Sequence, residues 1–355
     1  MSYNQTFRLK QSEDFADSAN IVQHLQAVAR IVLDPLIPEG SEVVMLDYPN
    51  NTNVGDSLIW LGEMAYLKSR KVNILYVCDI KNYNPDQLRR VLKNDTLILM
   101  HGGGNFGTVW TEIQQFRLQV LSDFSNHTII QFPQTLSFSD EPSIYEVASA
   151  IKKQRNYHLL TRSNVSMALA KSHFDCHVHL CPDMAFFIGN LTAPAVPDVE
   201  VLILSRTDHE KSKHNQLNQL QIPNIDTLCV DWLSPSRYER LLHRVVMHTA
   251  FFRSRYDKNN LFLCKLWCEL SRIRMKRGMA LLTKGKLVAT DRLHAHILSI
   301  LMNKTHLFVD NSYGKLGNFY LTWTESYAKA YWMKSDADIP EMAKRLLTDQ
   351  ALPLG

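Results

Sequence analysis

The sequence predicts an α/β protein with two domains, each built around a parallel sheet. Short apolar runs alternate with stretches of helical spacing along the first half of the chain. This alternation stops at residues 190–200, where prolines occur without any periodic pattern, and it starts again at Val201. With 355 residues the chain is long enough for two cores. We therefore expect an N-terminal arm over residues 1–19, one domain over residues 20–193 and a second over residues 198–355.

The first half contains the complete pattern of a parallel sheet. Its expected elements, in chain order, are helix 21–37, strand 43–46, helix 57–70, strand 72–77, helix 86–92, strand 96–100, helix 111–124, strand 128–132, helix 143–153 and strand 157–160. Strands that are separated by helices form βαβ units, so this half is expected to be Rossmann-like.

The second half repeats the alternation less regularly. Its expected elements are strand 201–204, helix 237–246, a long helix 260–282, strand 286–289 followed directly by a helix, strand 306–309 and a terminal helix 340–348. This half is also expected to be Rossmann-like. In open α/β sheets ligands bind at the carboxyl ends of the strands, so we place the site in the cleft between the two domains.

The composition is that of an ordinary globular protein. Hydrophobic residues make up 45% and charged residues 21%, and the formal net charge is +4. No apolar run approaches the length of a transmembrane helix, and residues 1–10 lack the apolar segment of a signal peptide. The six cysteines form no CxxC pair, which favours a reducing compartment. We therefore expect a cytoplasmic protein.

The junction after strand 286–289 carries the strongest functional signal. Asp291 occupies the expected N-cap position, which places Arg292 and His294 in the first helical turn. A helix N-terminus disfavours a cation unless an anion offsets it, so Arg292 predicts an anionic ligand. The same dipole favours the neutral form of His294, which can act as a base. In the alternative interpretation Arg292 pairs with a nearby carboxylate and His294 is an ordinary histidine at the core boundary.

Two further arginines, Arg162 and Arg206, directly follow predicted strands. Three guanidinium groups that converge in one cleft would suit a ligand with both a phosphate and a carboxylate. Any one of them could instead form a salt bridge. At the end of the first strand, Asp56 is expected to cap the helix that starts at Ser57, or to present hydrogen-bonding groups to hydroxyls together with Asn53.

The segment Gly102-x-Gly104-x-x-Gly107 matches the dinucleotide fingerprint letter for letter. It follows the third strand, however, whereas that fingerprint opens the first βα turn, and the next strand does not end in the required acid. NAD is therefore not expected. Two interpretations of this segment remain. It could be a glycine loop that approaches another anion or a sugar, or a plain tight turn.

A histidine-rich segment is the best candidate for a metal site. His177, His179 and Cys181 would share one face of a strand. Ligands so close on one strand splay too far for tetrahedral zinc, and no second ligand pair has zinc spacing. We expect no metal and interpret this face as a polar outer surface.

Arg272, Arg274, Lys276 and Arg277 lie late in the long helix, where cations complement the helix dipole. We interpret them as a solvated face, with contact to a membrane surface or a polyanion as the alternative. Aromatic residues do not interleave with these charges, so no nucleic acid is expected as a partner.

Taken in order along the chain, these motifs resemble the polysaccharide pyruvyltransferase family, most closely its bacterial exopolysaccharide and capsule members. The resemblance extends from about residue 43 to residue 325. It is carried by residues 53–56 (NVGD), 101–107 (HGGGNFG), 132–134 (FPQ), 161–162 (TR), 182–183 (PD), 205–208 (SRTD), 290–294 (TDRLH) and 310–315 (DNSYGK).

The resemblance implies a glycosyltransferase-B-like fold and a specific reaction. Phosphoenolpyruvate would be the donor, and a hexose of a polysaccharide or of its lipid-linked precursor would be the acceptor. The product would be a pyruvate ketal, and neither a cofactor nor a metal would be needed. A lipid-linked acceptor would bring the protein to the inner face of the membrane as a peripheral partner. The open alternatives are a glycosyltransferase that uses a nucleotide sugar, and a scaffold in a polysaccharide assembly complex.

The resemblance also suggests roles for individual residues. It implies that Arg292 and His294 serve donor binding and catalysis, and that Arg162 is a further donor-binding arginine. Because ketal formation needs a group that gives and takes protons near neutrality, His294 is the candidate for that role. The residues expected to hold the donor are Arg162, Arg206, Arg292 and Lys315. Those expected to face the acceptor are Asn53, Asp56, Gly103, Gly104 and Asn105.

Overall fold

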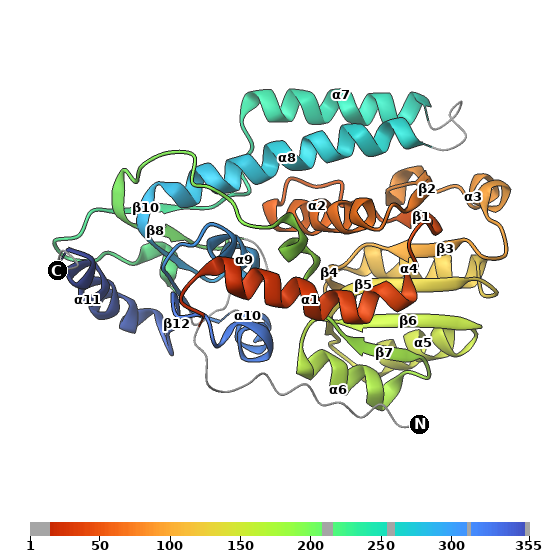
Figure 1. The fold of residues 1–355 in the computed structure, drawn as a ribbon, viewed down its shortest axis with the longest axis horizontal. Coiled ribbons are helices and arrows are strands. Elements are labelled where there is room, and N and C mark those ends of the chain that lie inside the picture. The colour runs from red at the N-terminus through yellow and green to blue at the C-terminus, as the bar shows by residue number, and fades with distance from the viewer. Residues whose placement is uncertain (1–14, 208–215, 254–259, 311–313, 352–355) are drawn as a thin grey trace.

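The computed structural model describes residues 15–207, 216–253, 260–310 and 314–351. Over these residues the strands form two parallel sheets, which lie in the two halves of the molecule (Figure 1). The larger sheet has the order β2-β1-β3-β5-β6-β7, with β4 paired to β5, and the smaller has the order β12-β11-β10-β8-β9. The expected α/β fold with two parallel sheets is confirmed. The division at residues 19, 193 and 198 stays a prediction.

The strands are short and largely apolar. Those of the larger sheet are β1 (Glu42–Leu46), β2 (Asn73–Val77), β3 (Leu97–Met100), β4 (Gly103–Gly107), β5 (Thr128–Ser137), β6 (Asn156–Thr161) and β7 (His177–Leu180). Those of the smaller sheet are β8 (Val199–Leu204), β9 (Thr227–Val230), β10 (Gly285–Thr290), β11 (His306–Phe308) and β12 (Ala330–Trp332). Central strands of parallel sheets are covered on both faces, which is why β1 and β10 are nearly continuous apolar runs.

Helices cover both sheets. In the first half they are α1 (Ser18–Leu36), α2 (Val54–Ser69), α3 (Pro85–Val91), α4 (Thr111–Asp123), α5 (Glu141–Lys152) and α6 (Asn164–His173), followed by the 3₁₀ helix η2 (Met184–Ile188). In the second half they are α7 (Arg237–Arg253), α8 (Leu261–Thr283), α9 (Leu293–Leu301), α10 (Lys315–Phe319) and α11 (Ile339–Ala351). Among the described residues, no helix combines the length and the apolar character needed to cross a bilayer.

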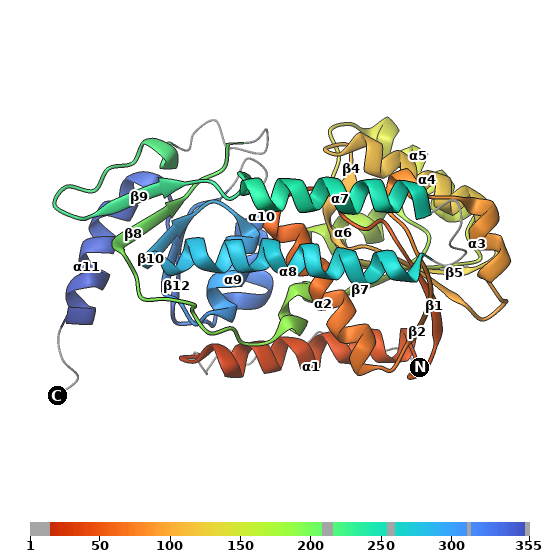
Figure 2. The same ribbon diagram turned by 90° about the horizontal axis from the view of Figure 1, so that it is seen from above.

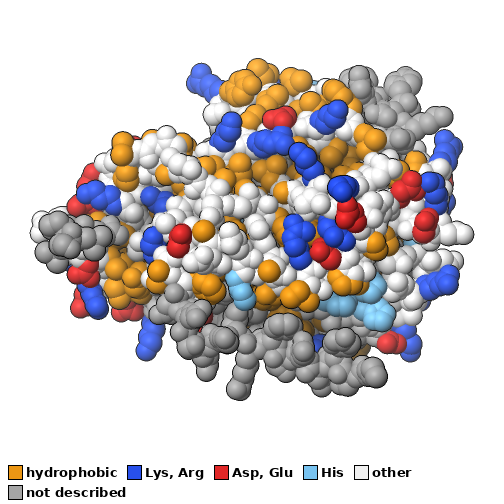
Figure 3. Space-filling view, viewed as in Figure 1, with side chains coloured by type: hydrophobic (Ala, Val, Ile, Leu, Met, Phe, Trp, Pro, Cys, Tyr) orange, Lys and Arg blue, Asp and Glu red, His pale blue; other side chains and the backbone are white. Residues whose placement is uncertain are grey.

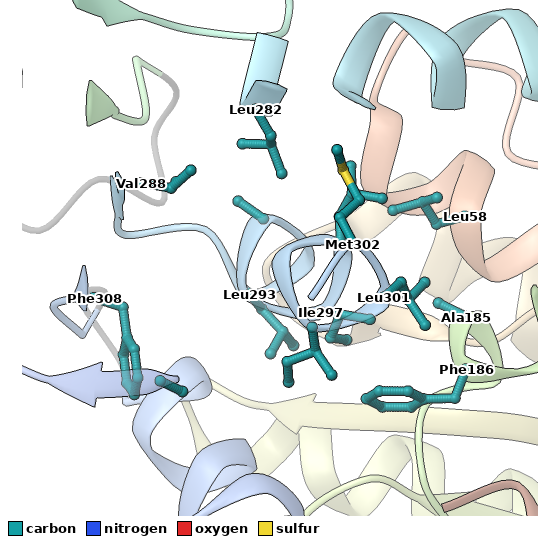
Figure 4. Packing of buried hydrophobic residues seen from close by; sticks show 14 of the residues in the cluster. Leu58, Ala185, Phe186, Leu282, Val288, Leu293, Ile297, Leu301, Met302 and Phe308 are labelled. Carbon is teal, nitrogen blue, oxygen red and sulfur yellow. The ribbon is translucent and has the colours of Figure 1, made fainter. Parts of the chain in front are cut away.

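A shared core joins the two halves around α9. Every residue of α9 is buried. Figure 4 shows Leu293 and Ile297 of this helix surrounded by side chains from both halves, among them Leu58 of α2 and Phe186 of η2. Burying one such side chain contributes about 1.5–3 kcal/mol, so this cluster fixes the two sheets relative to each other.

Helices α7 and α8 also link the halves. They lie side by side and extend from the smaller sheet across the larger one (Figure 2). Helix α8 packs closely on α2, where a Cβ at Gly278 would lie 2.6 Å from Cγ1 of Val54. Farther along α8, the Trp267 ring stacks on Tyr48 with a centroid distance of 4.4 Å. These contacts fix the segment after β1, which forms part of the site described below.

The helix after β1 begins earlier than the sequence predicts. Its N-cap is Asn53, whose side chain accepts a hydrogen bond of 3.0 Å from the Gly55 amide. Asp56 lies inside the first turn, so the expectation that it caps a helix starting at Ser57 is wrong. Asn and Asp are almost equally good N-caps, so local preference alone cannot choose between them.

The helix after β10 also differs at its start. Arg292 occupies the N-cap position without a side-chain cap, and α9 begins at Leu293. The carboxylate of Asp291 instead accepts a hydrogen bond of 2.9 Å from the backbone amide of Arg206, which follows β8. Asp291 is therefore not the N-cap. It ties two neighbouring strand ends together, a long-range contact that local patterns do not reveal.

The glycine-rich segment is a strand and not a loop. Gly103–Gly107 forms β4, which runs parallel to β5 beyond the end of β3. Gly107 has a φ of 120°, and a Cβ there would collide with the Ser137 carbonyl of β5. These glycines therefore allow two backbones to approach closely. They do not open a helix, which a dinucleotide-binding turn would require.

The basic residues late in α8 do not form one solvated face. Arg274 is fully buried and donates to the hydroxyl of Tyr48 at 3.2 Å. Arg277 forms an ion pair with the buried Glu239 of α7 and donates to the Thr52 carbonyl at 2.5 Å. The expected solvated face is thus wrong for these two arginines, because α7 covers them. Sequence spacing does not show which side of α8 another helix occupies.

The histidine-rich strand β7 pairs with β6. His179 lies with Nε2 at 3.1 Å from Nδ1 of His158, and burial lowers the pKa of both rings. Within the described part of the chain, no group of three or more His, Cys, Asp or Glu side chains could hold a metal ion.

Candidate active site

A pocket of about 640 Å³ lies where the carboxyl ends of strands from both sheets face each other. Its volume is within the range of small-molecule sites. The wall from the first half includes Asp47, Asn50, Asn53, Asp56, His101, Gly104 and Asn105. The wall from the second half includes Arg206, Trp232, Arg292, His294 and Lys315. The fold thus brings together most of the residues that the sequence singled out, since the carboxyl ends of parallel strands share one edge.

The rim at the start of α2 is a small amide and carboxylate network. The Oδ2 atom of Asp56 accepts from the side-chain amides of Asn51 at 2.9 Å and Asn53 at 3.2 Å. Both Asn53 and Asp56 line the pocket. Their predicted role toward the acceptor stays a prediction, but the network holds both side chains in place for hydrogen bonding to hydroxyl groups.

Gly104 and Asn105 of β4 form the next part of the wall, whereas Gly103 is not part of it. The side-chain oxygen of Asn105 accepts from Nη2 of Arg117 at 2.9 Å. Arg117 is fully buried, and its Nε donates to Gln131 at 2.8 Å. Because Arg117 occupies the oxygen of Asn105, the amide nitrogen of Asn105 is the group left to donate to a ligand.

Arg292 reaches the pocket from the start of α9 and is held by Asp231. Its Nη2 atom lies 2.6 Å and 2.8 Å from the two carboxylate oxygens. The guanidinium carbon lies 5.7 Å from the ring centre of Trp232. Arg292 therefore has the carboxylate partner that the alternative interpretation proposed, and it also lines the pocket. An ion pair of this kind orients the guanidinium group and offsets part of its charge.

Arg206 lines the same wall and is largely buried. Its amide is fixed by Asp291, whose pKa burial raises to about 6, although Arg206 and Arg292 lower it. The two arginines therefore stand at the ends of adjacent strands, β8 and β10, and face one pocket.

Asp183 binds two of the predicted site residues at once. Its Oδ2 atom forms an ion pair with Nη1 of Arg162 and lies 3.4 Å from Nε2 of His294. Its Oδ1 atom accepts from the Ala185 amide at 2.9 Å. Burial alone would raise the pKa of Asp183, but His294 and Arg162 hold it well below its usual range. Asp183 is thus a buried carboxylate that joins the two halves of the site.

Arg162 lies behind the pocket wall, not on it. It is fully buried, and its Nε donates to Thr135 at 2.9 Å. Its Nη2 atom has no hydrogen-bond partner among the described residues. A Cβ at Gly104 would lie 3.0 Å from this Nη2 atom and would collide with Nζ of Lys315. Arg162 and Lys315 therefore converge on Gly104, where the lack of a side chain lets the two cations approach each other.

The ring of His294 packs against the start of α2. A Cβ at Gly55 would collide with its Nδ1 atom, so the glycine makes this close contact possible. Burial lowers the pKa of His294, whereas Asp183 raises it. The net shift is downward, which keeps the imidazole neutral at physiological pH. This is the direction that the sequence predicts, but its main cause is burial.

A buried Glu–His pair in the pocket floor was not predicted. Nδ1 of His101 lies 2.7 Å from Oε2 of Glu63, and Oε1 of Glu63 accepts from the Gly102 amide at 2.8 Å. Burial lowers the pKa of His101, but Glu63, Asp47 and Asp56 together raise it more, so the net shift is upward. Nε2 of His101 has no partner among the described residues. The residue itself lines the pocket.

Asp47, at the end of β1, was also missed. It adopts a left-handed backbone conformation with a φ of 70°, which is unusual for a residue other than glycine. Its carboxyl group is buried, and Oδ2 has no partner among the described residues. Burial raises its pKa to about 7, although His101 and Arg117 lower it. A carboxyl group that exchanges a proton near neutrality therefore lines the pocket.

We expect an Asp47→Asn variant to be more stable than the wild type at high pH. Because the folded-state pKa is about 7, above the unfolded value, Asp47 increasingly destabilises the fold as pH rises from about 4 to 7. The amide removes this cost. The difference in unfolding free energy should grow by about 2–3 kcal/mol in favour of the variant between pH 5 and pH 8, measured by denaturant titration. A difference that does not change with pH would contradict the assignment.

Comparison with known proteins identifies the family to which this chain is similar. The family described as polysaccharide pyruvyl transferase matches residues 53–313. The Bacillus subtilis protein EpsO is 31% identical over 82% of this chain and 88% of its own length. Pyruvyl transferase 1 of Schizosaccharomyces pombe is 30% identical over 79% of this chain and 69% of its own length.

The fold is also found among solved structures. The uncharacterized protein KP1_0663 of Klebsiella pneumoniae matches with a TM-score of 0.55 and 19% identity, covering 88% of this chain and 99% of that one. The family match covers most of the chain, and it includes most of the residues that line the pocket, from Asn53 to His294. The chain belongs to the polysaccharide pyruvyl transferase family and is therefore a pyruvyltransferase.

Proposed function

We propose that this protein transfers the pyruvyl group of phosphoenolpyruvate to a hexose of a polysaccharide or of its lipid-linked precursor, and forms a pyruvate ketal. The observation that carries the proposal is the gathering of cationic groups around one pocket. Arg206, Arg292 and Lys315 line the wall from the second half, and Lys315 meets the buried Arg162 at Gly104. Phosphoenolpyruvate has a phosphate and a carboxylate on adjacent atoms, and these cations can bind both.

The cations differ in what they can contribute. Asp231 orients Arg292, so the guanidinium group of Arg292 has a fixed direction in the pocket. Arg162 is oriented by Asp183 and points its remaining Nη2 atom toward Gly104. Lys315 is the first residue of α10 and lines the pocket. As phosphate leaves, these groups offset the negative charge on the departing oxygen.

The reaction requires proton transfers but no change of oxidation state. One sugar hydroxyl gives its proton to a base and adds to C2, and that proton passes to the methylene carbon of phosphoenolpyruvate. A second hydroxyl then displaces phosphate from C2, and phosphate takes up the second proton. The products are a cyclic ketal and inorganic phosphate. No cofactor and no metal enter this balance.

His294 is the proposed proton-transfer group. It lines the pocket, it is neutral near physiological pH, and its Nε2 atom faces Asp183. A neutral imidazole accepts the hydroxyl proton, and Asp183 stabilises the imidazolium that results. The same imidazolium can then deliver a proton to the methylene carbon.

The opposite wall is suited to a sugar. Asn53, Asp56 and Asn105 present hydrogen-bonding side chains, and Gly104 lies beside Asn105 in the same wall. Asp47 and His101 add a carboxyl group that titrates near pH 7 and an imidazole donor. We assign this wall to the acceptor.

The test is to incubate the purified protein with phosphoenolpyruvate and a panel of soluble p-nitrophenyl hexosides. Release of inorganic phosphate that depends on one hexoside, together with a product of the mass of a pyruvyl ketal, would support the proposal. Transfer from UDP-hexoses to the same acceptors, without phosphate release from phosphoenolpyruvate, would instead identify a glycosyltransferase.

A further inference from the structure

Helices α7 and α8 expose a cluster of apolar side chains. The described residues include twelve large hydrophobic side chains that are exposed, and five of them lie on these two helices. Those on α7 are Tyr238, Leu241 and Val245, which are 67%, 59% and 53% exposed. Their spacing of three and four residues places them on one stripe of the helix. The others are Leu261 and Phe262, at the start of α8.

Cations accompany this stripe. Arg237, Arg240 and Arg244 of α7 are exposed. The single acidic residue of α7, Glu239, is buried because it forms an ion pair with Arg277 of α8. Among the described side chains of α7, the exposed face therefore carries arginines and apolar groups and no carboxylate.

Helix α8 continues this surface. Lys265, Arg272 and Lys276 are exposed, and the exposed acid Glu269 forms an ion pair with Arg272. Figure 3 shows hydrophobic and Lys or Arg side chains together at the top of the molecule, where Figure 1 places α7 and α8. We call the exposed residues of α7 and α8 the α7–α8 face.

We propose that the α7–α8 face docks on an anionic membrane surface. Interfacial helices have this combination of an apolar stripe and flanking cations. The apolar side chains enter the headgroup region, and the arginines bind lipid phosphates. A second copy of the chain is a poor occupant, because a two-fold contact would bring the arginine-bearing faces of two α7 helices together.

Helices α7 and α8 contact the rim of the pocket through half-buried side chains on their inner sides. Nε2 of His243 in α7 lies 3.0 Å from the side-chain oxygen of Asn50, and Arg277 of α8 donates to the Thr52 carbonyl. Asn50 and Thr52 both line the pocket. Docking through this face would therefore bring the pocket close to the membrane, where a lipid-linked acceptor is held. The idea that docking serves a lipid-linked acceptor rests on the proposed function. The docking of the α7–α8 face on the membrane does not depend on it.

The test is sedimentation of the full-length protein with vesicles. Phosphatidylcholine vesicles with added phosphatidylglycerol should bind the wild type, and pure phosphatidylcholine vesicles should not. Each basic residue near an anionic surface strengthens binding about fivefold. The triple variant R237Q/R240Q/R244Q should therefore bind about a hundredfold more weakly. The double variant L241S/V245S should also bind more weakly, and this loss should persist at low salt.

Matched controls lie elsewhere on the surface. The variant K152Q/K153Q/K171Q removes the same charge from exposed positions on and beside α5 and on α6, and Y145S/V165S removes two exposed apolar side chains from these helices. Both controls should bind like the wild type. Equal losses in the controls would show unspecific attraction and overturn the proposal, as would the absence of binding to anionic vesicles. Self-association lost in L241S/V245S would identify a second copy as the occupant and would also overturn it.

Activity separates this proposal from the proposed function. Variants of the α7–α8 face should transfer pyruvate to a soluble hexoside at the wild-type rate, and their thermal unfolding should be unchanged. An inactive wild type that still binds anionic vesicles would refute the proposed function and leave docking intact. An active wild type that does not bind anionic vesicles would refute docking and leave the proposed function intact.

Discussion

A His294→Gln variant should lose pyruvyl transfer, with kcat reduced by about 10²–10⁴. Glutamine keeps the size and polarity of the side chain but cannot exchange a proton near neutrality. The wild-type kcat/KM should fall as the pH falls through the pKa of His294, which burial holds below its ordinary value even though Asp183 raises it. The measurement is phosphate release from phosphoenolpyruvate at saturating acceptor, across a range of pH.

The matched control is His296, two residues along the same helix. Its ring is buried between His306 and Thr324, at 2.8 Å from each, and it is not part of the pocket wall. His296→Gln is expected to lower stability without reducing the kcat of the folded enzyme more than a few-fold. If His294→Gln retained wild-type kcat, the proton-transfer role would pass to another group, with Asp47 and His101 as candidates because both line the pocket.

An Asp183→Asn variant should lose both stability and activity. It leaves Arg162 buried without a compensating charge, and breaking a buried ion pair in this way costs about 3–5 kcal/mol. It also removes the carboxylate that raises the pKa of His294 and orients the ring, so kcat should fall at least about tenfold. Denaturant unfolding and steady-state kinetics on the same preparation measure the two effects.

An exposed Asp–Arg pair provides the comparison. Asp86 and Arg89 are 2.8 Å apart on the surface of α3, with side chains that are 78% and 50% exposed. Asp86→Asn should change the unfolding free energy by less than about 1 kcal/mol. A double variant, Arg162→Met with Asp183→Leu, should be less destabilised than the sum of the two single changes. Additive effects would show that the two side chains are not energetically coupled.

Much of the site's location could be predicted from sequence. Arg206, Arg292 and His294 follow apolar runs, and parallel strands bring their carboxyl ends to one edge of a sheet. Asn53 and Gly104 follow from the same reasoning in the first half. All five line the pocket. The order of strands and helices could also be predicted from the sequence, because the period of the apolar pattern changes at each boundary.

The partners of these residues could not be predicted. Asp183 and Arg162 follow the adjacent strands β7 and β6, but His294 belongs to the other half of the molecule. The pairing of Asp183 with His294 depends on how η2 packs under α2, where Gly62 permits contact with the Met184 carbonyl. Asp231, which orients Arg292, belongs to no motif that sequence spacing indicates. Such contacts depend on tertiary packing, which local propensity does not reveal.

Backbone conformation was the other source of error. The left-handed φ of Asp47, which turns its carboxyl group into the pocket wall, has no sequence signature of its own. The glycine segment fitted a loop by composition, but its close approach to β5 made it a strand. In both cases the backbone conformation depends on contacts with a neighbouring element.

The central claim is that the pocket binds phosphoenolpyruvate through its cations. Isothermal titration of the wild type and Arg292→Ala with phosphoenolpyruvate, and in parallel with UDP-hexoses, tests it most directly. We predict saturable binding of phosphoenolpyruvate to the wild type, loss of that binding in the variant, and no binding of UDP-hexoses. Binding of a UDP-hexose without binding of phosphoenolpyruvate would contradict the account.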